Sequence, residues 1–332
     1  MDFRFSEAQT ALRDSVRAYL DDAHPPALLR RLDRDGPDPS IWRGLAKMGL
    51  PAALVPEAAG GLGLTLVEGA LIAAELGRAN LGDLLADTAL IAAPWLAHHG
   101  DTGALADIAA GTRRIALAHK INPWIADLDQ ADAVLTAAGL VPPPSTKTRL
   151  ESVDPLRRLF TPLSIAHADD LLLNLAALMT AAQMLGATER MLAMATDYAK
   201  TRKQFGQPIG AFQAIKHLLA NVAERLEFAR PVVWHAAYAL HHGHPHAPTH
   251  VSHAKLAATD AAMLAAETAI QVHGAMGYTY EVDLHYWMKR TWALAGAWGD
   301  QNFHQQRVDQ AIIGGLLPIG PGTTFSSEDQ HA

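Results

Sequence analysis

Two short stretches in the C-terminal half decide the fold: TRKQFGQPIG at residues 201–210 and QVHGAMGY at residues 271–278. Each one follows a long segment in which apolar residues recur at helical spacing, and each brings in glycine where that helix is expected to end. The two stretches are therefore expected to be short connections between long helices.

The segments around these stretches predict a bundle. Apolar spacing indicates helices over 171–202, 211–240, 250–273 and 284–313. Arg202 and Lys203 are expected in the last turn of the first helix, and Pro231 is expected to kink or interrupt the second. Long helices with short connections predict an antiparallel four-helix bundle over 166–316, and the Gly/Pro/Ser-rich tail at 317–332 is expected to fray.

The N-terminal region, 1–112, is expected to be helical, and the next region, 113–165, to form a small β domain. Ser6 is a suitable N-cap for the first helix. Helical spacing recurs over 6–20, 41–48, 66–76 and 83–99. Short apolar runs between polar turns predict strands at 115–118, 133–136 and 159–161. The predicted fold class is mainly α with a small β domain.

Composition limits the function. The chain of 332 residues, 49% of them apolar, is long enough to bury a sizeable core. A net charge of −7 argues against a nucleic-acid-binding protein, which normally carries a basic face. The absence of cysteine excludes disulfides and thiolate chemistry. We expect neither a signal peptide nor a membrane span, and hence a cytoplasmic protein.

Further N-terminal motifs extend the pattern: LVPE at 54–57, GGLG at 60–63 and AELGR at 74–78. Together with the two C-terminal stretches, they strongly resemble motifs of the acyl-CoA dehydrogenase family. The order of a helical domain, a small β domain and a helical bundle is similar to that family's architecture over nearly the whole chain. The middle β domain is shorter here than is usual in the family.

The resemblance implies FAD as the cofactor, bound across a subunit interface. In the family the flavin ring lies in the β domain of one subunit, and the helical bundle of its neighbour holds the adenine and pyrophosphate end. The matching nucleotide-end positions here are Arg202, Gln204, Phe205, Gln213, Gln271, Gly274, Ala275 and Gly277. Arginine offers a planar fork to phosphate oxygens, and glycine lets backbone N–H groups approach them. Ala275 stands where the family has a glycine, a departure expected to loosen the fit.

The resemblance also gives two positions for a catalytic base, and neither carries one. The position on the last helix is Trp298, and the one on the first bundle helix falls near Ala176. Neither an indole nor a methyl group can remove the α-proton of an acyl thioester. Between Arg113 and Ile165 the chain also lacks a counterpart of the family's flavin-lining T-E-P-x-x-G-S-D segment.

These features lead to the hypothesis of a base-lacking subunit of a heteromeric FAD-dependent acyl-CoA dehydrogenase. It would complete the FAD site of a homologous, base-bearing subunit that binds most of the acyl-CoA, in an expected α2β2 assembly. The resemblance also implies an electron-transfer flavoprotein or a similar electron acceptor, and steroid side-chain CoA as a candidate substrate.

Two alternatives stay open. One is a self-sufficient enzyme that uses Asp300 or Asp170 as its base, and the other is a structural subunit that has lost flavin. Asp169 and Asp170 are expected to occupy the N-cap and first turn of the first bundle helix. Asp300, two residues beyond Trp298 on an expected helix, would point away from that site.

Two other clusters have simpler interpretations. The stretch HHGHPHAPTH at 241–250 indicates a polar connection between two helices rather than a metal site, because its glycine and prolines mark a loop. Aromatic residues recur near helical spacing at Tyr286, Trp287, Trp292 and Trp298. They predict core packing or a subunit interface rather than a ligand site.

Overall fold

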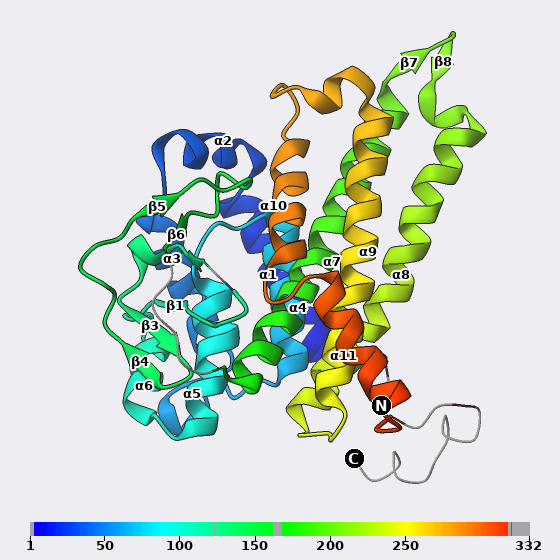
Figure 1. Cartoon of the computed structure of the whole chain (residues 1–332). Helices are drawn as coiled ribbons and strands as arrows, with labels where there is room; N and C mark the ends of the chain where they lie inside the picture. Colours follow the sequence, from blue (N-terminus) through cyan, green and yellow to red (C-terminus); the bar gives the residue numbers. More distant parts are fainter. Residues whose placement is uncertain (1–2, 123, 162–167, 318–319, 321–332) are drawn as a thin grey trace.

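The computed structural model describes residues 3–122, 124–161, 168–317 and 320, and it begins with a helical N-terminal region (Figure 1). The helices of this region are α1 (Glu7–Ala23), α2 (Pro26–Asp35), α3 (Pro39–Lys47), η1 (Leu50–Ala52), η2 (Glu57–Ala59), α4 (Leu66–Ala79), η3 (Ala86–Ala92), α5 (Ala93–His99) and α6 (Thr102–Ala109). Ser6 caps α1 as predicted: its hydroxyl accepts from the Gln9 N–H at 3.1 Å, and the Gln9 side chain accepts from the Ser6 N–H at 2.9 Å.

The middle region forms two small three-stranded sheets. Its elements are β1 (Ile115–Leu117), β2 (Ile125–Ala126), η4 (Leu128–Gln130), β3 (Ala133–Thr136), β4 (Gly139–Val141), β5 (Arg149–Leu150) and β6 (Leu159–Phe160). The strand orders are β1-β3-β4 and β2-β6-β5, and only the β1–β3 pair is parallel. The predicted strands correspond to β1, β3 and β6. The other three strands, β2, β4 and β5, were not predicted.

The C-terminal region is a helical bundle, as predicted. Its elements are α7 (Asp170–Thr201), β7 (Lys203–Gln204), β8 (Gln207–Pro208), η5 (Ile209–Ala211), α8 (Gln213–His241), α9 (Ala247–His273), η6 (Gly274–Tyr278), α10 (Leu284–Gly296) and α11 (Gln301–Ile313). Helix α7 is central: it packs on α8, α9 and α10 within the bundle and on α4 of the N-terminal region.

Burial explains the composition of α7. By length and hydropathy it could cross a membrane, since residues 171–188 carry no charge. However, 89% of its most apolar stretch is buried inside the fold. Two glycines bring α4 and α7 into backbone contact: a Cβ at Gly77 would lie 1.9 Å from the Gln183 carbonyl oxygen, and one at Gly186 would lie 1.8 Å from that of Ala74.

Several expectations about the bundle need correction. Lys203 lies in strand β7 and not in the last turn of α7, and α8 continues through Pro231 without interruption. The expected fourth helix is two helices, α10 and α11, separated by residues 297–300. Of the expected frayed tail, residues 318–319 and 321–332 lie outside the described part.

The aromatic residues of α10 and of the segment after it are core residues in all but one case. Tyr286, Trp287 and Trp298 are at most 5% exposed, whereas Trp292 is 40% exposed. The Trp287 indole N–H donates to the Arg78 carbonyl at 2.9 Å, which joins α10 to the end of α4.

Candidate functional site

The first motif stretch forms a hairpin that projects beyond one end of the bundle (Figure 1). Strands β7 and β8 pair across a two-residue loop, Phe205-Gly206, with φ angles of 52° and 83°. Positive φ at both positions is typical of a type I′ turn, and it is rare for a bulky residue such as phenylalanine. The Phe205 side chain is 91% exposed, so the hairpin presents an aromatic ring outside the chain's own core.

Backbone and ring contacts fix the base of this hairpin. The Arg202 N–H donates to the Tyr198 carbonyl, and the Arg202 carbonyl accepts from the Ile209 N–H, both at 2.8 Å. The Tyr198 ring stacks on His273, with ring centroids 4.4 Å apart. Because His273 ends α9, this contact brings the two motif stretches to the same end of the bundle.

The second motif stretch turns the chain at the end of α9. Gly274 has a φ of 58°, which favours glycine, and a Cβ at Gly277 would lie 2.9 Å from the Ile270 carbonyl oxygen. Ala275 lies exposed in this turn, so its methyl group meets no steric conflict there. The side chains of Arg202, Gln204, Phe205, Gln213 and Gln271 are also exposed, and only Gly277 of the predicted nucleotide-end set is buried.

Trp298 lies in the break between α10 and α11. Its φ is 59° and that of Gly299 is 96°, so two left-handed residues in succession end one helix and redirect the chain into the next. The indole is 5% exposed and packs in the main core, with its ring 6.0 Å from that of His119. The Trp298 N–H donates to Asn122 Oδ1 at 3.3 Å, which attaches the break to the middle region.

Polar side chains from α9 and α11 hold this break. The Lys255 amino group is buried and donates to the carbonyls of Leu294 and Ala295, at 2.9 and 3.2 Å. His304 Nε2 donates to the Trp298 carbonyl at 3.0 Å, and its Nδ1 accepts from the Ser252 hydroxyl at 3.1 Å. Burial lowers the pKa of His304 to about 4, so the imidazole is neutral at pH 7.

The alternative bases have structural roles. The Asp300 carboxylate caps α11 by accepting from the Phe303 N–H at 2.8 Å, and it does not lie on a helix that continues from Trp298. Asp169 caps α7 through the Leu172 N–H at 2.6 Å and Asp170 is in the first turn, as predicted. Ala176 is fully buried in α7. Within the described residues, no group of three or more His, Cys, Asp or Glu side chains is placed to hold a metal ion.

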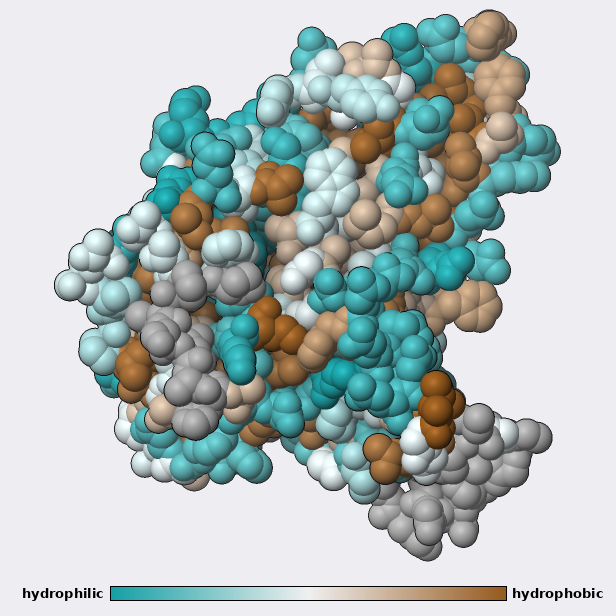
Figure 2. All heavy atoms as spheres, viewed as in Figure 1, coloured by the Kyte–Doolittle hydropathy of each residue, from teal (hydrophilic) through white to brown (hydrophobic). Residues whose placement is uncertain are grey.

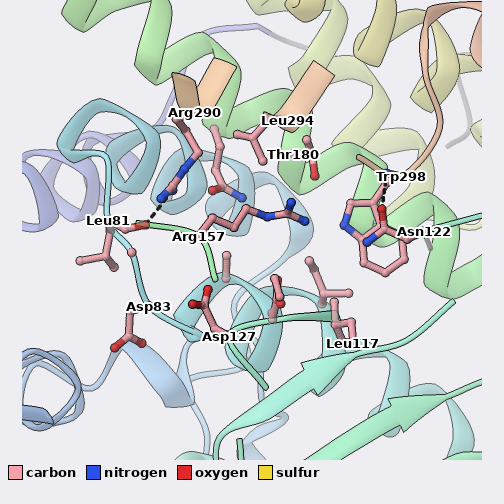
Figure 3. A pocket seen from close by; sticks show the side chains of 16 residues that line it. Leu81, Asp83, Leu117, Asn122, Asp127, Arg157, Thr180, Arg290, Leu294 and Trp298 are labelled. Carbon is pink, nitrogen blue, oxygen red and sulfur yellow. Dashed lines mark hydrogen bonds between the residues drawn. The ribbon is translucent and has the colours of Figure 1, made fainter. Parts of the chain in front are cut away.

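A small polar cavity borders Trp298 (Figure 3). Its volume is about 50 Å³, and its walls come from η3, the middle region, α7 and α10. Figure 3 shows the Arg157 side chain lying across the cavity and Trp298 closing one side next to Asn122. Sites for drug-sized ligands occupy about 300–1,000 Å³, so this space is too small for an acyl chain or a tricyclic ring.

The walls of this cavity are charged. Arg290 forms a buried ion pair with Asp154 and donates to the Leu81 carbonyl at 2.9 Å. Burial raises the pKa of Asp83 and that of Asp87 to about 7, and it lowers the pKa of Arg157. A cavity lined in this way disfavours an apolar acyl chain even apart from its size.

Sequence reasoning did not find this charged group. Its members are Asp83, Asp87, Asp127, Asp154, Arg157 and Arg290. They come from three regions, and the ion pair of Arg290 with Asp154 joins residues 136 positions apart. A usable signal would have been the isolated aspartates inside the apolar segment 81–97, because a carboxylate there needs a partner.

Known proteins share these sequence patterns. The model of the acyl-CoA dehydrogenase C-terminal domain matches residues 168–313, and that of the N-terminal domain matches residues 6–104. The chain is 36% identical over 302 residues to the acyl-CoA dehydrogenase IpdE2 of Mycobacterium tuberculosis, covering 86% of this chain and 91% of that one. This chain belongs to the acyl-CoA dehydrogenase family.

Other comparisons agree with the family assignment. The acyl-CoA dehydrogenase IpdE2 of Mycolicibacterium smegmatis is 31% identical over 329 residues, which cover 93% of this chain and 100% of that protein. A chain of the ChsE4-ChsE5 complex from Mycobacterium tuberculosis has the same fold, with a TM-score of 0.83 at 24% identity and coverage of 96% and 100%. Butyryl-CoA dehydrogenase from Megasphaera elsdenii gives a TM-score of 0.81 at 21% identity, with coverage of 94% and 100%.

FAD is the cofactor expected for this family. The exposed Arg202 and the glycine turn at Gly274 fit a phosphate-bearing group, because both can direct donors to it. The cavity beside Trp298 does not fit the flavin ring, since only about 50 Å³ is left there. The chain therefore offers groups that fit the phosphate-bearing end of FAD, but its cavity beside Trp298 has no room for a flavin ring.

We expect a pH-dependent contribution of Lys255 to stability. Burial lowers its pKa from 10.5 to about 7. Between these pH values the unfolded chain binds a proton that the folded chain does not, so stability rises with pH through this window, by up to about 1.4 kcal/mol per pH unit. Urea unfolding at pH 7.5 and pH 9.5 should show a steeper rise for the native chain than for Lys255→Met.

Lys200→Met is the matched control, because the Lys200 side chain is 70% exposed. This control should keep the pH slope of the native chain. Equal slopes for the native chain and Lys255→Met would mean that Lys255 is charged in the folded state at pH 7.5.

Proposed function

We propose that this chain is the supporting subunit of a heteromeric, FAD-dependent acyl-CoA dehydrogenase. It supplies the nucleotide end of the FAD site to a homologous partner that carries the base, the flavin-ring pocket and most of the acyl-CoA site. Arg202 and the glycine turn at Gly274 would hold the nucleotide end of FAD. The flavin would supply the hydride acceptor for the α,β-dehydrogenation, and the partner would supply the carboxylate base.

The proposal rests on the contrast between the exposed β7–β8 hairpin and the closed region around Trp298. At the end of the bundle, Phe205 is 91% exposed in a left-handed conformation, next to an exposed Arg202. A non-glycine residue held in this conformation costs about 1–3 kcal/mol, and such strain is concentrated at ligand sites. A ring and a guanidinium held outside the chain's own core are suited to a ligand that another chain also contacts.

The region next to Trp298 supports the same proposal. The indole occupies the position of the family's base, and the adjoining cavity is small and charged. The acyl α-carbon has to lie within reach of a base, so this half-site lacks both the base and the room for its substrate. Asp300 caps α11 and Asp170 lies in the first turn of α7, and these structural placements disfavour a self-sufficient enzyme.

Fold neighbours support a partner of this type. They include a chain of the ChsE4-ChsE5 complex and a chain of the Tcur3481-Tcur3483 steroid ACAD. Each of these names two components, and the second also names steroids. For this chain we propose an α2β2 assembly in the cytoplasm, with steroid side-chain CoA as the first substrate to try and an electron-transfer flavoprotein as the electron acceptor. The rival hypothesis is a purely structural subunit that has lost flavin. Under that hypothesis, Arg202→Ala leaves the FAD occupancy of the complex unchanged.

The flavin content of the complex tests the nucleotide-end assignment. The chain purified alone should be colourless, and the chain co-expressed with its base-bearing homologue should be yellow. Because a hydrogen bond to a charged group contributes about 1.5–3 kcal/mol, Arg202→Ala should weaken FAD binding by about 10- to 100-fold. Absorbance at the flavin band during dilution of the complex measures this loss.

Lys200→Ala is the control for that experiment, because it removes the same charge from the same end of α7. Its FAD affinity should equal that of the native complex. A stoichiometric yellow colour in the chain alone would reject the shared site, and equal flavin retention in the Arg202 and Lys200 variants would favour the structural rival.

Variants of Trp298 test whether its half-site takes part in the reaction. Trp298→Ala should lower the free energy of unfolding by about 3–5 kcal/mol, because it leaves a cavity in the core. Trp298→Phe should cost less, since it keeps a ring in that place. Turnover per FAD in the co-purified complex should stay at the native value for both variants, because the chemistry takes place in the partner's site.

A variant that unfolds gives no answer, so Trp298→Phe decides the case if Trp298→Ala does not assemble. A large loss of turnover per FAD in a folded Trp298→Phe complex would contradict the proposal that this half-site is silent.

A further inference from the structure

A second cavity lies apart from the charged one and has the opposite character. Its volume is about 450 Å³, against about 50 Å³ for the cavity beside Trp298. The two share no lining residue. It is formed by the segment 54–66 with α5, the first turns of α7 and the end of α8. Figure 1 shows α5, the start of α7 and the α8–α9 connection at the same end of the molecule, opposite the β7–β8 hairpin.

Six leucines line this cavity. Leu54, Leu66 and Leu175 are buried and form its floor. The half-buried side chains around them are Leu64, Leu171 and Leu240. The hollow opens to the surface, and its volume of about 450 Å³ lies within the range of about 300–1,000 Å³ that small-molecule sites occupy.

The wall formed by residues 52–64 is rigid, so the hollow is preformed. The N–H groups of Leu62, Gly63 and Leu64 donate to the carbonyls of residues 52, 55 and 53 at 2.9–3.0 Å. Gly61 lies so close to Val55 that a Cβ would be 2.0 Å from the Val55 carbonyl oxygen. A preformed apolar hollow with few polar groups is the usual form of a small-molecule site.

Three polar side chains, Glu57, His98 and His241, stand at the rim. A neutral imidazole offers one donor and one acceptor, and a carboxylate offers acceptors only. Burial lowers the pKa of His241, which keeps this imidazole neutral at pH 7. A ligand hydroxyl can both donate to and accept from such a rim, whereas a ligand carboxylate would be repelled by Glu57.

We propose that this leucine-lined hollow is a binding site for a long-chain aliphatic alcohol, whose chain lies on the leucines and whose hydroxyl meets the Glu57, His98 and His241 rim. The site is separate from the FAD end and from Trp298, and it holds whether or not the chain works with a catalytic partner.

Fluorescence titration of the full chain with parinaryl alcohol and with parinaric acid tests this site at pH 8. The alcohol should bind saturably, with one molecule per chain, and the acid should bind at least about tenfold more weakly. Ala97 lines the hollow and is half-buried, so Ala97→Trp should fill it and weaken alcohol binding at least about tenfold.

Ala109→Trp is the matched control. Ala109 is also a half-buried alanine packed against the main core, but it does not line the hollow, so its variant should bind like the native chain. His241→Leu is a second variant, at the end of α8, and it should reduce the preference for alcohol over acid.

Three results would overturn the proposal. The Ala97 and Ala109 variants could bind the alcohol equally well, the alcohol could bind without saturation, or the acid could bind as tightly as the alcohol. Loss of alcohol binding when the chain enters its complex would also overturn it, because the hollow would then be a surface covered by a protein partner.

Discussion

The left-handed pair Trp298-Gly299 is the constraint on which the rest of the site depends. It separates α10 from α11, and it turns an indole inward at a position where neither helix could direct it. Such a conformation is unfavourable for tryptophan and persists only when the surroundings fix it. Here Lys255 satisfies the carbonyls at the end of α10, and His304 satisfies the Trp298 carbonyl. These buried donors offset the strain and determine the shape of the neighbouring cavity.

The charged residues in the walls of that cavity add little net stability, although removing one of them would be costly. Burying an ion pair costs desolvation that the attraction between the charges only partly returns, so such a pair is weak evidence of net stabilisation. Removing one partner of Arg290–Asp154 would nevertheless be costly, because a buried charge would remain. Since Arg290 also bonds the Leu81 carbonyl, the pair connects the bundle, the middle region and the N-terminal region. We infer that these charges fix how the three regions pack together.

Sequence patterns predicted the parts of the fold that depend on local rules. The Ser6 cap, the long helix α7 and the short connection after it follow from capping, apolar spacing and glycine placement. The β7–β8 hairpin within that connection was not predicted, because its strands are only two residues long. The break at 297–300 was missed, because the apolar spacing runs on through it and its cause is distant: the partners Lys255, His304 and Asn122 belong to other elements. The Arg290–Asp154 pair was missed for the same reason. Its charges look like solvated surface residues until the fold brings them together.

The core around Trp298 and the β7–β8 hairpin differ in the space and the exposed groups that they offer to a ligand. This difference argues for a second chain. Around Trp298 the side chains of Lys255, His304 and Arg290 bond to groups of the same fold, and the residual space holds little more than water. At the β7–β8 hairpin, the guanidinium of Arg202 and the ring of Phe205 are exposed, and the turn that carries them is strained. The β7–β8 pairing and the contact of the Phe205 ring with Phe212 hold this turn within the chain, and strained exposed groups of this kind are concentrated at ligand sites, where a further contact adds to these. A cofactor anchored in another subunit would supply that contact, whereas a cofactor confined to this chain would have to place its ring in a cavity too small for it.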